Sequence, residues 1–370
     1  MALRKTPIVI GVLTAAVVSG GAAYAMTTTG QSAAQQPGTI ASVADFTSGS
    51  PTTIYLEADL NGRNEQTKMP QSGMGDPRGS ATEILRIKGN QVAFEISWHN
   101  LGAPTVAQVH SGAPGTTGGM VMPMVTAPMS DTLTAVAGSV TVNDARLLMR
   151  MVNSPNQFYL NVGNVKYPKG AVRGQFRRIG PVDLQRIMHV GPFAALNSGD
   201  QEVAAAGDNG AHASAFLGLN TTSINYAVSW NGLTSPTSFA IDQGAVGMNG
   251  APVATLFVAR HGLTPAITAV AGTAMNVSAK TIAAIKANPA MFYTNLTTGR
   301  FPLGAARGQL FQVISNATMP PTTMPTTPMK PTTTMPTQPT MPTQPSMPTQ
   351  PTQSSQPGMP SASTPAPPHW

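Results

Sequence analysis

The chain has 370 residues, a formal net charge of +7 and no cysteine. Charged residues make up 9% of it and aromatic residues 5%, whereas 36 glycines and 34 prolines are present. The absence of cysteine excludes disulfides, thiolate metal sites and cysteine nucleophiles. Low charge with many turn-forming residues favours short strands over long surface helices, and a net charge this mild indicates solubility rather than nucleic-acid binding.

Residues 1–25 have the pattern of an export signal. Arg4 and Lys5 precede an apolar run, and small residues follow as far as Ala25. A positive start, an apolar run and an Ala-x-Ala ending are the parts of a cleaved signal peptide. We therefore expect a secreted or cell-wall-associated protein with no stable membrane span after cleavage. Residues 26–51, rich in Thr, Ser, Ala, Gln and Gly, are predicted to be a flexible segment.

Residues 52–179 are predicted to form a first domain built mainly from strands. Apolar and polar side chains alternate from Gln91 to Trp98, and this period of two is typical of a half-buried strand. The segment Asp144–Asn153 differs, because Leu148 and Met151 share a helical face and Asp144 is a suitable N-cap. The domain is therefore expected to carry one short helix.

The first domain ends in a phrase that occurs twice in the chain. Residues 167–179 read YPKGAVRGQFRRI, and residues 301–314 read FPLGAARGQLFQVI. Other features repeat at nearly the same offset, namely a tryptophan strand (Trp98 and Trp230), a Phe-Tyr-x-Asn strand (Asn161 and Asn295) and the short helix. A unit of about 125 residues is therefore present twice, which is the size of a domain. We expect a linker at 180–189 and a second domain at 190–314.

The composition changes again over residues 315–370. The phrase Met-Pro-Thr-Gln-Pro recurs at 335–339, 341–345 and 347–351. Such a segment cannot bury a core, and its prolines favour extended polyproline II. We predict a disordered, low-complexity tail rich in Pro, Thr, Met and Gln.

Each repeat resembles the chordin-type (CHRD) domain. The resemblance lies in an opening Leu-Asn segment with a following glutamate, the tryptophan strand, the Phe-Tyr-x-Asn strand and the closing Pro-x-Gly-x-x-Arg-Gly-Gln motif. It implies an all-β fold of two tandem β-sandwich-like domains, immunoglobulin-like or dismutase-like in type, and no established activity.

The closing motif contributes three residues to each repeat, which are Arg173, Gly174 and Gln175 in the first and Arg307, Gly308 and Gln309 in the second. One interpretation is an anion or carboxylate clamp, because arginine binds such groups in a bidentate manner. The favoured interpretation is structural: each arginine bonds backbone carbonyls or an acid of its own domain and fixes the last strand. Asn161 and Asn295 are expected to be its turn or bonding partners.

A metal site was considered at the strand where many chordin-type domains carry a His-x-His pair. Alternate strand positions place two imidazoles on one face. Here the pair is replaced by Gln108 and His110 in the first domain and by Ala240 and Asp242 in the second. The remaining candidates are His110 with Met120, Met122 and Met124. The alternation of these methionines along one strand places them on one face, where their thioethers suit Cu(I). Core packing by the methionines is favoured, and no metal or cofactor is predicted.

No known catalytic motif occurs, and no catalytic residue is assigned. The few carboxylates are interpreted as solvated loop residues, although Glu65 and Asp76 were considered as an acid/base pair; the full set is Glu57, Asp59, Glu65, Asp76, Glu83, Asp200, Glu202, Asp208 and Asp242. The basic stretch 166–189 is interpreted as a solvated linker, with docking on an anionic wall polymer as the alternative.

The sequence therefore favours a non-enzymatic secreted or cell-surface protein with a structural, adhesive or ligand-binding role. Its expected partner is an extracellular protein or a cell-wall polymer, and no nucleic acid. The alternatives are a copper- or zinc-binding protein acting through the first domain, and a wall-polymer module acting through residues 166–189. Oligomeric state and the relative orientation of the domains stay open.

Overall fold

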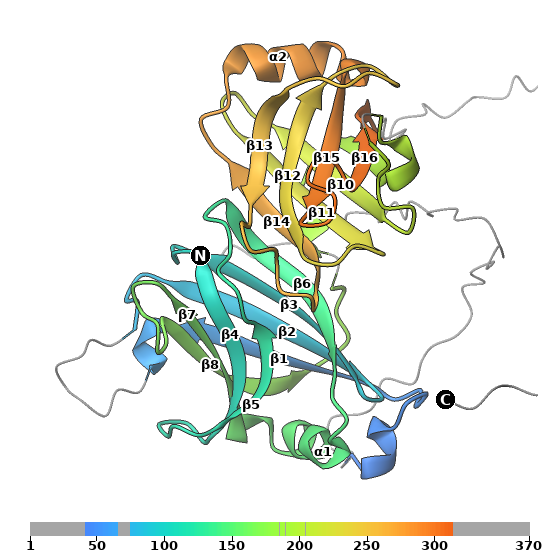
Figure 1. Cartoon of the computed structure of the whole chain (residues 1–370). Helices are drawn as coiled ribbons and strands as arrows, with labels where there is room; N and C mark the ends of the chain where they lie inside the picture. The colour runs from blue at the N-terminus through green and yellow to red at the C-terminus, as the bar shows by residue number, and fades with distance from the viewer. Residues whose placement is uncertain (1–40, 66–74, 185, 189, 204, 314–370) are drawn as a thin grey trace, which may run out of the picture. The chain divides into compact units, whose positions relative to one another are not determined.

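The computed structural model describes residues 41–65, 75–184, 186–188, 190–203 and 205–313. The expected export signal and the Pro-rich tail lie outside these residues. Within them the chain is an all-β protein of two domains, with two short α-helices and several 3-10 helices. Figure 1 labels most of the strands and both α-helices. No helix among the described residues is long and apolar enough to cross a membrane.

The first domain is one antiparallel sheet that curls on itself. Its strands pair in the order β5-β4-β7-β8-β1-β2-β3-β6. Their bounds are β1 Thr53–Asn61, β2 Ser80–Lys88, β3 Gln91–His99, β4 Pro104–Ser111, β5 Met120–Val125, β6 Leu133–Thr141, β7 Phe158–Asn164 and β8 Val172–Ile179. Helix α1 (Ala145–Asn153) connects β6 to β7.

The second domain repeats this order as β13-β12-β15-β16-β9-β10-β11-β14, with β17 also beside β9. The strands are β9 Phe193–Ser198, β10 His212–Leu219, β11 Ile224–Asn231, β12 Pro236–Gln243, β13 Pro252–Val258, β14 Ile267–Ala274, β15 Phe292–Thr298, β16 Ala306–Gln309 and β17 Phe311–Gln312. Helix α2 (Ala279–Ala287) connects β14 to β15. The shared strand order shows that the sequence repeat is a repeated domain.

The alternating strands place their apolar side chains in the core. Phe94, Ile96 and Trp98 of β3 are buried, and Trp230 is buried at the matching place in β11. Burial of each such side chain contributes about 1.5–3 kcal/mol to the free energy of folding, because its apolar surface is removed from water.

The two helices differ in how they begin. The carboxylate of Asp144 accepts hydrogen bonds from two backbone amides of α1 at 3.0 Å, so it caps the helix as expected. Ser278 stands at the matching position of α2 but makes no capping bond through its side chain. Both helices bury one face against their own domain, through Leu148 and Met151 in α1 and through Ile282 and Ile285 in α2.

Two segments expected to be loose are packed where the structure describes them. In the segment 26–51, Ala41 and Phe46 are buried, and the Asn153 side chain bonds both the N–H and the carbonyl of Ala41 at 2.8 Å. In the linker 180–189, Ile187 and Met188 pack against a small cluster of alanines from both domains. Apolar side chains inside each segment account for the difference, because burial removes them from water.

The two domains pair with each other through one edge strand of each. Strand β6 of the first domain pairs antiparallel with β14 of the second, and the equivalent residues Val136 and Val270 lie opposite each other. The hydrogen bonds are reciprocal, since the Ser139 N–H donates to Ala266 and the Thr273 N–H donates to Thr132, at 2.9 and 2.8 Å. The pairing therefore has the two-fold character of an isologous interface, and it covers two sheet edges that would otherwise be open.

Two glycines permit this close approach of the strands. A Cβ added at Gly138 would overlap the carbonyl oxygen of Ala266, and one added at Gly272 would overlap the carbonyl oxygen of Thr132. A glycine in a strand commonly marks such a contact between backbones. The repeat of this glycine in both domains thus has a physical cause in the joint itself.

Replacing both glycines with alanine (G138A/G272A) should loosen the joint, because two backbone oxygens must move. We expect amide hydrogen exchange at Ser139 and Thr273 to become at least tenfold faster, as measured by NMR or mass spectrometry. Gly119→Ala is the matched control, since a Cβ there meets nothing within 4 Å. Unchanged exchange at both amides in the double variant would contradict a tight joint.

Candidate functional site

The repeated polar residues converge on the outer face of each domain, opposite the core. In the first domain, His110 of β4, Tyr159 of β7 and Gln175 of β8 lie in one cross-strand row, and Gln108, Asn161 and Arg173 lie in the next. The second domain has the matching rows Asp242, Tyr293, Gln309 and Ala240, Asn295, Arg307. The closing motif therefore lies on the same face as the positions where a His-x-His pair would lie, with strand β7 or β15 between them.

Each arginine of the motif is buried and stacked on a tyrosine. The guanidinium carbon of Arg173 lies 3.3 Å from the ring centre of Tyr159, and that of Arg307 lies 3.5 Å from the ring centre of Tyr293. The two arginines are only 3% and 2% exposed. Because they are removed from water, the attraction between cation and ring is stronger than at a surface.

The same arginines bond the loop that follows β4 or β12. Arg173 donates to the carbonyl oxygen of Thr116 at 2.6 Å and to that of Ala113 at 3.4 Å. Arg307 donates through Nη2 to the carbonyl oxygens of Ala245 and Met248 at 2.9 and 2.8 Å, and through Nη1 to Oδ1 of Asn249 at 2.9 Å. All of these partners except Asn249 are backbone carbonyls, which is the kind of contact that the structural interpretation requires.

The glutamine of the motif ties the same loop to the turn before β7 or β15. Gln175 donates to the carbonyl oxygens of Gly112 and Asn156, both at 2.8 Å. Gln309 donates to those of Gly244 and Ala290, both at 2.7 Å. Arginine and glutamine together therefore hold each long loop along its length.

The glycines of the motif are required by close contacts. A Cβ at Gly174 would overlap the backbone of Asp59 in β1, and one at Gly308 would meet the backbone of Leu196 in β9. The earlier glycines of the phrase, Gly170 and Gly304, lie directly against a glutamate carboxylate. The motif is therefore a set of packing constraints around one arginine.

The glutamates beside these glycines, Glu65 and Glu202, complete the cluster. Burial raises the pKa of each carboxyl to about 7, and the nearby Arg173 or Arg307 partly offsets this rise. The acid/base pair of Glu65 and Asp76, one alternative that the sequence allows, is not formed. Instead, Asp76 accepts hydrogen bonds from the backbone of Arg78 and Gly79, whereas Glu65 faces the arginine.

The two domains differ at the position next to the tyrosine. In the first domain, the His110 ring stacks on Tyr159 with 5.2 Å between ring centres, and its Nδ1 lies 3.1 Å from the Gly118 carbonyl oxygen. In the second, Asp242 is buried and accepts a 3.4 Å bond from Asn295. Burial raises the pKa of Asp242, and hydrogen bonds from Asn295 and Tyr293 act against the rise.

The asparagines bond the turn that precedes the last strand. Asn161 donates to the carbonyl oxygen of Lys169 at 3.0 Å, and Asn295 donates to that of Leu303 at 3.3 Å. They therefore fix the Pro-x-Gly part of the phrase, one strand away from the loop that the arginine holds.

The three candidate methionine ligands do not share one face. Met122 and Met124 are buried, whereas Met120 is 50% exposed. The cause is a register shift between Met120 and Met122, which places Met120 opposite His110 and turns it away from the core. Among the described residues, no group of three or more His, Cys, Asp or Glu side chains could hold a metal ion.

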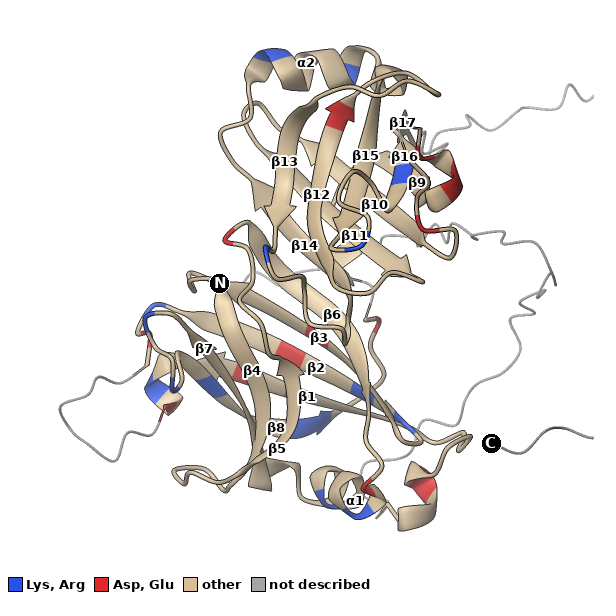
Figure 2. Cartoon of the chain, viewed as in Figure 1, with Lys and Arg blue, Asp and Glu red and all other residues tan. Residues whose placement is uncertain are grey.

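The basic stretch 166–189 is largely part of the domain and not a solvated linker. Arg173 is buried in the cluster, and Arg177 of β8 bonds Glu57 and Asp59 of β1 at 2.7 and 3.1 Å. Figure 2 shows how few charged residues the strands carry. Lys166 lies over the ring of Tyr167 at 5.1 Å. The sequence could not show this because pairing across strands joins residues far apart in the chain.

The interpretation of the carboxylates as solvated is wrong for Glu65 and Glu202, which are partly buried in the clusters, and for two more that are buried. Glu83 of β2 is fully buried, and neither of its carboxylate oxygens has a hydrogen-bond partner among the residues that the structure describes. Burial therefore raises its pKa well above the ordinary value. Asp242 is the second case. Strand periodicity gave the signal for Glu83, because it lies on the same face as Leu85 and Ile87.

Comparison with protein families assigns the two domains. The model of the CHRD domain matches residues 56–176 and 193–310. The chain therefore belongs to the CHRD domain family, whose members are non-catalytic all-β modules of extracellular proteins. No curated protein and no solved structure matches the chain.

Removing the stacked arginine should destabilise its domain strongly. Arg307→Gln leaves buried carbonyls without their donor and Glu202 without its counter-charge, so we expect a loss of about 3–5 kcal/mol in the free energy of unfolding. Urea denaturation followed by tryptophan fluorescence measures it. Lys286→Gln on the exposed face of α2 is the control; a loss below about 1 kcal/mol for Arg307→Gln would mean that the clamp is dispensable.

Stability should fall as the pH rises from about 4.5 to about 7. The folded-state pKa of Glu65 and Glu202 is about 7, above the ordinary 4.5, so the folded protein binds more protons than the unfolded chain over this window. The variant E65Q/E202Q cannot ionise at these sites. Its stability relative to the parent should rise between pH 4.5 and 7.5 in urea titrations, and a constant difference would show that the two carboxyls titrate normally.

Proposed function

We propose that this chain is an exported, non-enzymatic protein that acts by contact, with the held loops of its CHRD domains forming the surface that a partner recognises. The N-terminal pattern and the extracellular character of the family support export. The partner class is an extracellular protein on the cell that carries this chain or on its neighbours.

The observation that carries this proposal is the loop between β12 and β13. Val246 and Met248 in this loop are 79% and 62% exposed, yet its backbone is bonded at Gly244, Ala245 and Met248 by side chains of the closing motif. Apolar side chains on a fixed backbone lose little conformational entropy on binding, which favours affinity. A fixed loop with exposed apolar side chains is thus suited to recognition.

The loop of the first domain is held in the same way but displays different chemistry. Residues 112–119 read GAPGTTGG, whereas residues 244–250 read GAVGMNG. The scaffold is therefore shared and the displayed side chains are not. This separation between a rigid frame and variable loops is common among binding domains.

A bead assay tests the proposal. Beads coated with the parent protein should attach to cells that express it, and V246S/M248S should reduce the attached number at least tenfold, because hot-spot side chains carry most of a binding energy. Val165→Ser is the control, since Val165 is 85% exposed in the first domain and its loss removes an apolar side chain elsewhere.

Two results would contradict the proposal. Attachment of parent beads no greater than that of beads with an unrelated protein would remove the adhesive function. Equal attachment by the parent and V246S/M248S would remove the loop between β12 and β13 as the contact.

A further inference from the structure

A cleft of about 390 Å³ opens at one end of the second domain. Four connections converge there, namely those between β9 and β10, β11 and β12, β13 and β14, and β15 and β16. Loops at the mouth of a β-barrel-like fold are a frequent place for small ligands. The cleft is separate from the Val246 and Met248 loop of the proposed function.

The cleft gathers positive charge from two different connections. Arg260 and His261 come from the β13–β14 connection, and Arg300 comes from the β15–β16 connection. All three are exposed, and none forms a salt bridge within the described residues. Arg300 lies over the ring of Phe301, with 5.2 Å to the ring centre. Asp208 is the one acid in the lining.

Hydroxyl side chains also line the cleft. Thr234, Ser235 and Thr298 all border the cleft. Among the described residues, the side-chain hydroxyls of Thr234 and Ser235 make no hydrogen bond. They are therefore available to a ligand that offers both donors and acceptors.

The backbone of the cleft includes a residue in an energetically unfavourable conformation. Ser235 has a φ of 50°, which is uncommon for a residue other than glycine. Gly262 has a φ of 76°, and a Cβ there would meet the backbone of Ser235. This contact brings the β13–β14 connection, with its Arg260 and His261, against the turn that carries Ser235. Strained backbone of this kind clusters at binding sites.

We propose that this cleft binds an acidic saccharide, with Arg260 and Arg300 taking a sugar carboxylate and the Thr234, Ser235 and Asp208 side chains bonding sugar hydroxyls. The guanidinium groups match a carboxylate in geometry and charge. Asp208, whose Oδ1 accepts a hydrogen bond from the Gly210 N–H at 3.2 Å, would repel a simple anion, whereas a sugar hydroxyl can donate to its carboxylate. A saccharide supplies both kinds of group. The first domain lacks this arrangement, because its matching connection, residues 126–132, contains no basic residue.

Titration calorimetry of the full chain at low salt tests the proposal with a defined probe, an α-1,4-linked trimer of galacturonic acid. Maltotriose tests the sugar without its charge, and inorganic phosphate tests the charge without the sugar. We expect the galacturonate trimer to bind at least tenfold more tightly than either. Binding by phosphate or maltotriose as tight as that of the trimer would overturn the proposal, and so would no binding of the trimer.

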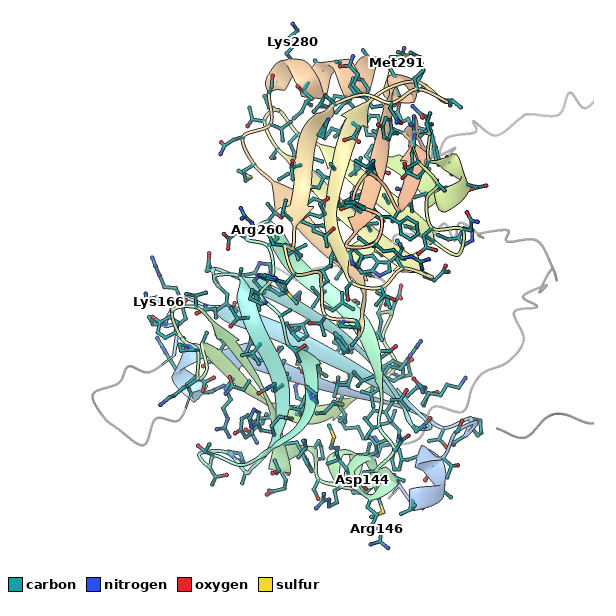
Figure 3. The ribbon with its side chains drawn as sticks, in the orientation of Figure 1. Asp144, Arg146, Lys166, Arg260, Lys280 and Met291 are labelled. Atoms are coloured by element: carbon teal, nitrogen blue, oxygen red, sulfur yellow. The ribbon has the colours of Figure 1, made fainter. Side chains whose placement is uncertain are left out.

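Matched variants then locate the site. R260Q/R300Q should weaken binding of the trimer at least tenfold, whereas K280Q/K286Q removes the same charge from exposed positions on α2 and should leave it unchanged. Figure 3 shows Arg260 and Lys280 at opposite ends of the second domain. An equal loss in both variants would mean attraction to net charge alone, and no loss in R260Q/R300Q would place binding elsewhere. Circular dichroism of each variant confirms that it is folded.

Discussion

A buried guanidinium stacked on a tyrosine ring joins strand β8 to the loop between β4 and β5 in the first domain, and strand β16 to the loop between β12 and β13 in the second. Placing a cation inside a protein costs several kcal/mol unless its charge and its donors are satisfied. Here loop carbonyls accept the donors of Arg173 and Arg307, the ring attracts the charge, and a glutamate lies nearby. The glycines of the repeated phrase are needed because a Cβ would collide with the groups packed against them. The glutamine adds further hydrogen bonds to the loop that the arginine binds.

The duplication has a second consequence at the edges of the sheets. Each domain alone would expose the edge strand β6 or β14, and pairing them covers both. The equivalent residues Val136 and Val270 face each other, so the contact has the form expected between two identical copies. The linker contributes apolar side chains to the same region. The two domains are therefore joined by a paired strand and by apolar contacts of the linker, and not by the linker alone.

The sequence predicted the all-β class, the two CHRD domains and both helices, because strand alternation, helical spacing and a repeated phrase are local signals. The contacts between side chains on neighbouring strands could not be predicted from the sequence. The stack of Arg173 on Tyr159 joins residues on neighbouring strands, although the tyrosine was already visible in the repeated Phe-Tyr-x-Asn phrase. The register shift that turns Met120 outward is an irregularity in the pairing of β4 with β5, and the cleft of Arg260 and Arg300 is formed by connections between strands. The period of two in the sequence encodes neither of them.

The central claim is that the buried arginines fix the loops at residues 112–119 and 244–250. Measuring the backbone rigidity of these two loops tests it most directly. Backbone ¹⁵N relaxation of the full chain gives order parameters for residues 112–119 and 244–250. If the arginine clamp fixes these loops, the order parameters should be about 0.85, as in the strands beside them. Values below about 0.6 in both loops would contradict the account, because a mobile loop cannot keep its carbonyls on a buried guanidinium.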